Sequence, residues 1–240
     1  MKNLLTLLLV CSGLFYPTTL SAQTADEVID RYYKAIGGKE NWRSVKNSLA
    51  SMTIKQMGRE LEAEIFIQHP NINYSLIKFS GVEIIQAYDG ENAWTLNPGS
   101  TKPELLDAAM AEEVKKIELQ EPILDYRSKG YSAAYLGTET FNGATCQKVV
   151  LTRKDGEKII YYFNLNSGLK VMELYKVTEG QQTTAESQTL FEDYQPIEGG
   201  FMMPYRIQEK SEGQVIVELI IHSYKLNVEM DKAKYTYPGN

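Results

Sequence analysis

The chain has very few cysteines and histidines, namely Cys11, Cys146, His69 and His222. Neither histidine has another histidine or a cysteine at the spacing of a metal-ligand motif, so the sequence predicts no metal site. Cys146 is the single cysteine after residue 22 and has no partner for an internal disulfide. The sequence also lacks a Gly-x-Ser-x-Gly elbow and a phosphate-binding glycine loop. We therefore expect no catalytic residues, no cofactor and no enzyme activity.

Clustered basic residues and long apolar runs are missing as well. The 25 Lys and Arg are outnumbered by 31 Asp and Glu, which gives a formal net charge of −6. We expect no nucleic-acid partner, because phosphates are bound by clustered Lys and Arg. The apolar stretch from Leu4 to Phe15 is shorter than the roughly 20 residues of a membrane span.

This apolar stretch has the features of an export signal. Lys2 supplies a positive start, and Leu20-Ser21-Ala22 supplies a small-residue cleavage site. We expect a signal peptide over residues 1–22, cleaved after Ala22, and one exported domain over residues 23–240. The alternative is lipidation at Cys11, which would anchor the protein to a membrane. Val10 precedes that cysteine where lipidation sites favour Gly or Ala.

After residue 22 the periodicity predicts one helix followed mainly by strands. Thr24 and Glu27 form a capping-box pattern, and Gly37-Gly38 ends the helix that follows. From Val45 onward apolar residues alternate with polar ones, first in two strands joined at Gly58, as in half-buried strands. Further strands are expected at residues 74–79, 82–88, 93–96, 133–141, 145–152, 158–164, 169–178, 184–194, 202–210 and 214–226.

Such a large sheet must curl, because strand twist accumulates and unpaired edges are a liability. We therefore predict a mainly β (α+β) protein, a single incomplete antiparallel β-barrel of about eleven strands. A sheet of that size is too wide for side chains alone to fill, so a hydrophobic cavity is expected inside it.

A second helical pattern follows Asn97-Pro98-Gly99. Thr101 and Glu104 form another capping box, and Glu121-Pro122 ends the pattern. One narrow apolar stripe runs along it, formed by Leu106, Met110, Val114 and Ile117. We expect this helix to lie on the sheet as a lid.

Several strands are apolar on both faces, whereas a one-sided sheet would alternate cleanly. Residues 159–163 and 215–221 are examples. One explanation is a core inside with helices packed outside, and the other is a lumen lined by aliphatic and aromatic groups. The residues predicted to line such a lumen are Met52, Ile54, Ile65, Ile67, Tyr74, Leu76, Ile84, Trp94, Tyr161, Phe163, Met172 and Leu174.

The motifs, taken in order, resemble a known family. Tyr88-Asp89-Gly90 is followed by Trp94 and Asn97-Pro98, and the chain closes with Met203-Pro204-Tyr205 and residues 235–238. This order resembles the LolA/LolB-like lipoprotein carriers of the outer-membrane lipoprotein-sorting type, over nearly the whole chain after residue 22. The resemblance implies a periplasmic, monomeric carrier that binds lipid or lipoprotein acyl chains in its cavity for transfer toward the outer membrane. Transient membrane-protein donors or acceptors would be its partners.

One position departs from the family pattern. Carriers of this type place an Arg before the Pro of His69-Pro70, where it holds the lid by hydrogen bonds, so the resemblance makes His69 a candidate for the lid latch. The departure leaves a second function open, an envelope sensor or scaffold module that binds a protein partner.

Overall fold

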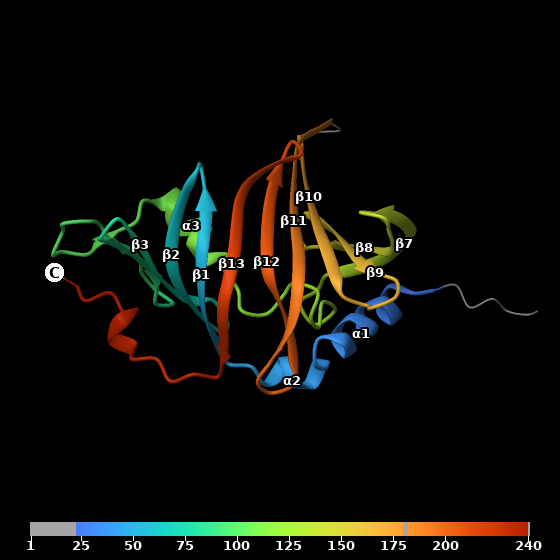
Figure 1. The fold of residues 1–240 in the computed structure, drawn as a ribbon, viewed down its shortest axis with the longest axis horizontal. Coiled ribbons are helices and arrows are strands. Elements are labelled where there is room, and N and C mark those ends of the chain that lie inside the picture. The colour runs from blue at the N-terminus through green and yellow to red at the C-terminus, as the bar shows by residue number, and fades with distance from the viewer. Residues whose placement is uncertain (1–22, 180–181, 240) are drawn as a thin grey trace, which may run out of the picture.

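The structure is a computed structural model that describes residues 23–179 and 182–239. Within these residues one antiparallel sheet of thirteen strands forms the body of the molecule (Figure 1). The strands are β1 (Asn47–Gln56), β2 (Arg59–Gln68), β3 (Ile72–Phe79), β4 (Val82–Tyr88), β5 (Ala93–Leu96), β6 (Glu104–Leu105), β7 (Ser132–Phe141), β8 (Ala144–Thr152), β9 (Lys158–Asn164), β10 (Lys170–Glu179), β11 (Gln182–Ile197), β12 (Phe201–Ser211) and β13 (Gln214–Leu226). The helices are α1 (Ala25–Ala35), α2 (Lys39–Ser44), α3 (Ala108–Lys115) and the short 3-10 helix η1 (Lys232–Lys234).

The sheet is open rather than closed. Its order is β6-β5-β4-β3-β2-β1-β13-β12-β11-β10-β9-β8-β7, so the first and last strands pair in the middle and β6 and β7 form the two edges. This arrangement confirms the predicted incomplete antiparallel barrel. The predicted signal peptide lies outside the described residues.

The predicted first helix is confirmed, including its cap. The Thr24 hydroxyl accepts from the Glu27 amide, and the Glu27 carboxylate accepts from the Thr24 amide at 2.8 Å. After the helix the chain turns at Gly37 and Gly38, which have φ of 116° and 95°. The short helix α2 then follows, which the sequence analysis did not predict.

The second helix is shorter than predicted. It starts at Ala108, where the Asp107 carboxylate accepts from the Met110 amide at 2.9 Å. The expected capping residue Glu104 instead lies in β6, where it pairs with Thr95 of β5. Residues 104–105 pair with the edge of β5 as a short strand. The helix therefore begins later in the chain, where Asp107 supplies the capping side chain.

The two faces of the sheet carry different elements. Helix α3 contacts β4 and β5, and α1 contacts β7 and β8. The pairings Ile54–Leu219 and Leu219–Ile207 place these residues on the same face as both helices, which we call the helical face. On the opposite face the C-terminal residues 228–237 cover β2 to β5, and we call it the tail face.

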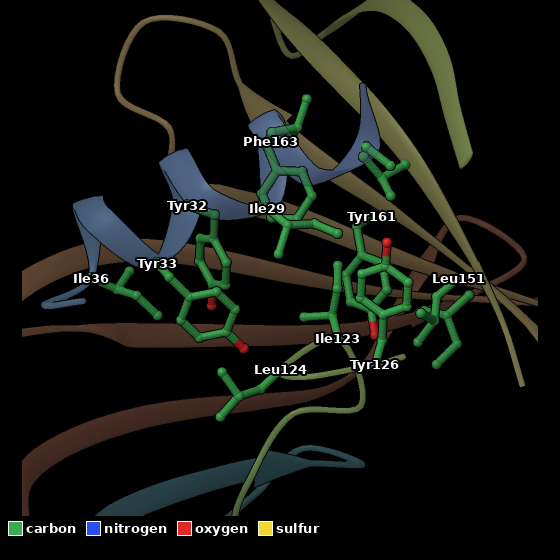
Figure 2. Packing of buried hydrophobic residues seen from close by; sticks show 14 residues of the cluster. Ile29, Tyr32, Tyr33, Ile36, Ile123, Leu124, Tyr126, Leu151, Tyr161 and Phe163 are labelled. Atoms are coloured by element: carbon green, nitrogen blue, oxygen red, sulfur yellow. The ribbon is translucent and has the colours of Figure 1, made fainter. Parts of the chain in front are cut away.

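The largest core lies on the helical face under α1 (Figure 2). Tyr32 and Ile29 of α1 pack against Phe163 of β9, and the Tyr32 and Phe163 ring centroids are 5.1 Å apart. Ile123 and Leu124 close the cluster from a segment far along the chain. This segment, residues 116–126, begins at the end of α3 and reaches α1, so it bridges the helical face (Figure 1). We call it the bridging segment.

Candidate ligand-binding site

The strand register separates the predicted lumen residues into two groups. Seven lie on the helical face: Met52, Ile54, Ile65, Ile67, Ile84, Tyr161 and Phe163. Tyr161 and Phe163 are fully buried under α1, so they belong to the packed core there. Five lie on the tail face: Tyr74, Leu76, Trp94, Met172 and Leu174. The prediction that all twelve line one lumen is therefore wrong for these five.

The C-terminal residues explain why both faces of β2 to β5 are apolar. The Trp94 indole donates to the Tyr235 carbonyl at 2.8 Å, and the Tyr235 ring stacks on Phe66 with centroids 5.8 Å apart. Tyr74 and Leu76 pack in the same cluster. These strands are covered on the tail face by a segment that no local pattern connects to them.

Met172 and Leu174 belong to a separate cluster on the tail face. They pack there with Cys146 and Leu190. Cys146 is buried, and burial raises the pKa of its thiol.

Only part of the predicted lid stripe packs against the sheet. Val114 is buried against Tyr88 and Ala93, with Leu106 beside them. Met110 and Ile117 are 49% and 40% exposed, so they do not seal the sheet in this structure. The expected four-residue apolar seal is reduced because α3 begins only at Ala108 and ends at Lys115.

Two asparagines hold the end of α3, and the sequence analysis missed both. The Asn73 amide donates to the Val114 carbonyl at 3.0 Å, and the Asn71 amide donates to the Lys115 carbonyl at 3.1 Å. His69, the predicted latch, has an exposed side chain. The sequence signal for the two asparagines is their spacing, because Asn71 and Asn73 flank Ile72 at the start of an apolar strand.

Between α1 and α3 the helical face presents an apolar surface. Ala50, Met52, Ala63 and Ile221 are buried there, and seven partly exposed residues surround them: Ile54, Ile65, Ile77, Tyr205, Ile207, Leu219 and Tyr224. We call these eleven residues the central apolar surface. They belong to β1, β2, β3, β12 and β13, which lie between the strands that contact the two helices. Half-buried aliphatic groups in such a patch are typical of an interaction site.

A cavity of about 170 Å³ adjoins this surface on the side of α1. Its walls are mainly aromatic and aliphatic, formed by Tyr32, Ile36, Trp42, Phe191, Tyr194, Met202, Met203, Pro204, Ile207 and Tyr224, together with Glu121 and Lys170. Ile207 belongs both to these walls and to the central apolar surface. Sites for small molecules commonly have apolar walls with a few polar groups.

The polar groups beside the cavity form one buried ion cluster. Lys170 Nζ lies 2.7 Å from Glu121 Oε1 and 2.5 Å from Glu173 Oε1, and the Lys170 side chain is only 3% exposed. The Tyr32 hydroxyl donates to Glu121 at 3.0 Å. The cluster joins the bridging segment, which contains Glu121, to β10 of the sheet.

The charge state of the cluster follows from its geometry. Burial by itself lowers the pKa of Lys170, but the carboxylates of Glu121 and Glu173 outweigh it and raise that pKa above its ordinary value. Lys170 therefore stays protonated at neutral pH. Within the described part of the chain, Glu121 Oε2 and the Tyr161 hydroxyl are buried without a hydrogen-bond partner. The sequence signal for this cluster is the presence of two charges, Lys170 and Glu173, inside the apolar run Leu169–Leu174.

Two further features bear on the kind of site. In residues 23–179 and 182–239, no three His, Cys, Asp or Glu side chains gather where they could hold a metal ion. Among the helices of the same residues, none combines the length and the apolar character needed to cross a membrane.

Comparison with known proteins gives matches in structure but none in sequence. No protein-family model matches the chain, and no curated protein matches it. A DUF1329 family protein from Desulfovibrio piger is similar over 90% of this chain and 98% of its own, with a TM-score of 0.60 and 13% identity. A putative outer membrane lipoprotein-sorting protein domain from Vibrio parahaemolyticus has a TM-score of 0.55 and 12% identity over 86% of this chain and 94% of its own.

A LolA superfamily protein from Nitrosomonas europaea is similar to the same extent, with a TM-score of 0.55 and 14% identity over 90% of this chain and 98% of its own. At these identities the likeness shows the fold alone. It confirms the fold implied by the resemblance of the sequence motifs.

Proposed function

We propose that this protein, which has a LolA-like fold, is a periplasmic carrier that binds the acyl chains of a lipid or lipoprotein for transfer toward the outer membrane. The observation that supports this most directly is the central apolar surface, which lies between α1 and α3 beside an apolar cavity. The proposed carrier holds its cargo without covalent chemistry and meets membrane-protein donors and acceptors transiently.

The physical chemistry of acyl chains suits exchange. Moving a methylene from water into an apolar site gains about 0.8 kcal/mol. Moving it from a bilayer into the same site gains almost nothing, because both surroundings are apolar. The direction of transfer would then depend on small conformational energies and on the partners at each membrane.

The proposed binding face can be tested with neighbouring residues of one strand. Leu219 lies on the helical face within the central apolar surface, whereas Ile220 pairs with Thr53 and Arg206 on the tail face. We expect Leu219→Asp to weaken binding of a fluorescent acyl probe at least about tenfold, because a carboxylate would have to be buried against the chain. Ile220→Asp is the matched control and should keep the affinity of the unaltered protein.

Native mass spectrometry of the protein purified from a bacterial envelope gives an independent test. Bound lipid or lipoprotein would support the carrier function. Equal probe affinity in the two Asp variants, or no probe binding by the unaltered protein, would contradict it. A protein partner recovered instead of lipid would favour the envelope sensor or scaffold.

A further inference from the structure

A second pocket lies next to the cavity, between the β11–β12 turn and the end of β13. It has a volume of about 350 Å³ and is lined by Ile197, Glu198, Gly199, Phe201, Tyr224, Lys225, Leu226, Asn227 and Val228. The cavity of about 170 Å³ is lined by Pro204, Met203 and, again, Tyr224. Tyr224 is the one residue that the two sets of walls share.

The Tyr224 side chain is held in place on several sides. Its hydroxyl donates to the Pro204 carbonyl at 3.0 Å. Its ring meets the Tyr205 ring edge to face, with centroids 5.6 Å apart and planes inclined by 80°. Across the strand pair it faces Ala50, whose small side chain leaves room for the ring. A ring fixed by a hydrogen bond, an aromatic contact and the register acts as a rigid wall rather than as a mobile side chain.

The volumes indicate what this wall does. An apolar cavity of about 150 Å³ holds a molecule of the size of benzene, so the smaller space accepts only a short part of an acyl chain. Ligand sites in proteins commonly measure about 300–1,000 Å³. The neighbouring pocket falls in that range, whereas the cavity does not, so a longer chain would need the space behind the Tyr224 ring.

We infer that Tyr224 sets the length of acyl chain that the cavity accepts, by closing it against the neighbouring pocket. The inference rests on the proposed function, because it concerns the same site and ligand class. A chain that enters beside Ile207 would run past Phe191 and Met203 and end against the Tyr224 ring. Carbons beyond that point stay in water and add little to the affinity.

A series of saturated fatty acids that displace one fluorescent acyl probe tests this. Each methylene that leaves water strengthens binding roughly fourfold. For the unaltered protein we expect the affinity to rise with chain length and then level off. Tyr224→Ala joins the two spaces, so the levelling should move to longer chains. The longest acids should bind at least about tenfold tighter, and the shortest should be unchanged.

Two controls isolate the wall from the rest of the structure. Tyr224→Phe keeps the ring and loses the hydrogen bond to Pro204, so it should level off at the same length as the unaltered protein. Tyr237→Ala removes a ring on the tail face that lines neither space, and it should also keep that length. Tyr224→Leu, which preserves more of the packing, replaces Tyr224→Ala if the latter does not fold.

The outcomes separate the two proposals. If no acid displaces the probe and the probe itself does not bind, the carrier function fails. If the unaltered protein binds but its affinity rises without levelling, or if Tyr224→Ala and Tyr224→Leu level off where it does, the role of Tyr224 is overturned and the carrier function stands.

Discussion

At the residue scale, one lysine neutralises two carboxylates in the interior. Replacing Lys170 by Met would leave Glu121 and Glu173 facing each other without a cation. Removing one partner of a buried ion pair costs about 3–5 kcal/mol of folding free energy, and we expect a loss of that size in urea unfolding. Lys78→Met is the control, because Lys78 forms an ion pair at the surface and such pairs contribute about 1 kcal/mol or less. Equal losses in the two variants would contradict this account.

Two adjacent glycines allow a second comparison between single residues. Both have positive φ, but a Cβ on Gly37 would lie 2.9 Å from the Gly200 carbonyl oxygen, whereas one on Gly38 meets nothing within 4 Å. We expect Gly38→Ala to lower the melting temperature through backbone strain alone, at a cost of about 1–3 kcal/mol. Gly37→Ala should lower it further, because α1 and the β11–β12 turn must separate. Identical melting temperatures of the two variants would mean that the contact between the new Cβ at position 37 and the Gly200 carbonyl is relieved without cost.

At the element scale, α3 is attached to the sheet by few interactions. Asn73 is buried and donates to the Val114 carbonyl at the end of the helix. Asn73→Ala removes this hydrogen bond, while the carbonyl keeps its bond from the Ile117 amide, so we expect a cost of about 1 kcal/mol. We expect faster hydrogen exchange for the α3 amides and unchanged exchange in β8 and β9. Asn71→Ala, at a half-buried position, should have a smaller effect, and a larger one would assign the main attachment to Asn71.

The C-terminal segment is the element that covers the tail face. Trp94→Phe keeps an aromatic ring but removes the N–H that donates to the Tyr235 carbonyl. We expect a loss of about 1–2 kcal/mol in unfolding free energy, because a buried carbonyl loses its donor. Acyl-probe affinity should stay unchanged, since Trp94 lies on the face opposite to the proposed site. A parallel loss of probe binding would place the ligand on the tail face instead.

At the scale of the whole molecule, the shifted ionisable groups define a pH range of constant stability. The hydrogen bond from Arg127 lowers the pKa of Asp26, and that from Arg43 lowers the pKa of Asp125. A carboxyl group whose pKa is lower in the folded state stabilises the fold above its unfolded pKa of about 3.9, and this contribution is lost as the pH falls. Lys170 has a raised pKa, so its contribution is complete below about pH 10.4 and is lost above it.

We therefore expect the unfolding free energy to be flat between about pH 5 and 9 and to fall on both sides. Urea unfolding at constant ionic strength across this range measures it. In Asp26→Asn the fall on the acidic side should be shallower, whereas the alkaline side should be unchanged. A steep slope near neutrality would point to a titrating group outside those named here.

Some properties of this protein follow from the sequence by itself, because they depend on neighbours along the chain. The capping box of Thr24 and Glu27 needs only three residues of spacing. The turn at Asp89 needs only the local carboxylate, which accepts from the Asn92 amide at 2.7 Å. The two-residue period predicts most of the strands, and the many strands with few helices predict an open antiparallel sheet.

Other properties were decided by the tertiary structure, because they join residues far apart in the sequence. The alternation along β3 shows two sets of residues but does not say which set faces the helices. That choice depends on the C-terminal residues around Tyr235, which bury Tyr74 and Leu76 on the tail face. The meeting of Glu121 with Lys170, and the position of Tyr224 between two pockets, likewise depend on how the bridging segment and β13 lie across the sheet. A pattern in sequence gives the period of burial, whereas the partner that does the burying is set by packing in three dimensions.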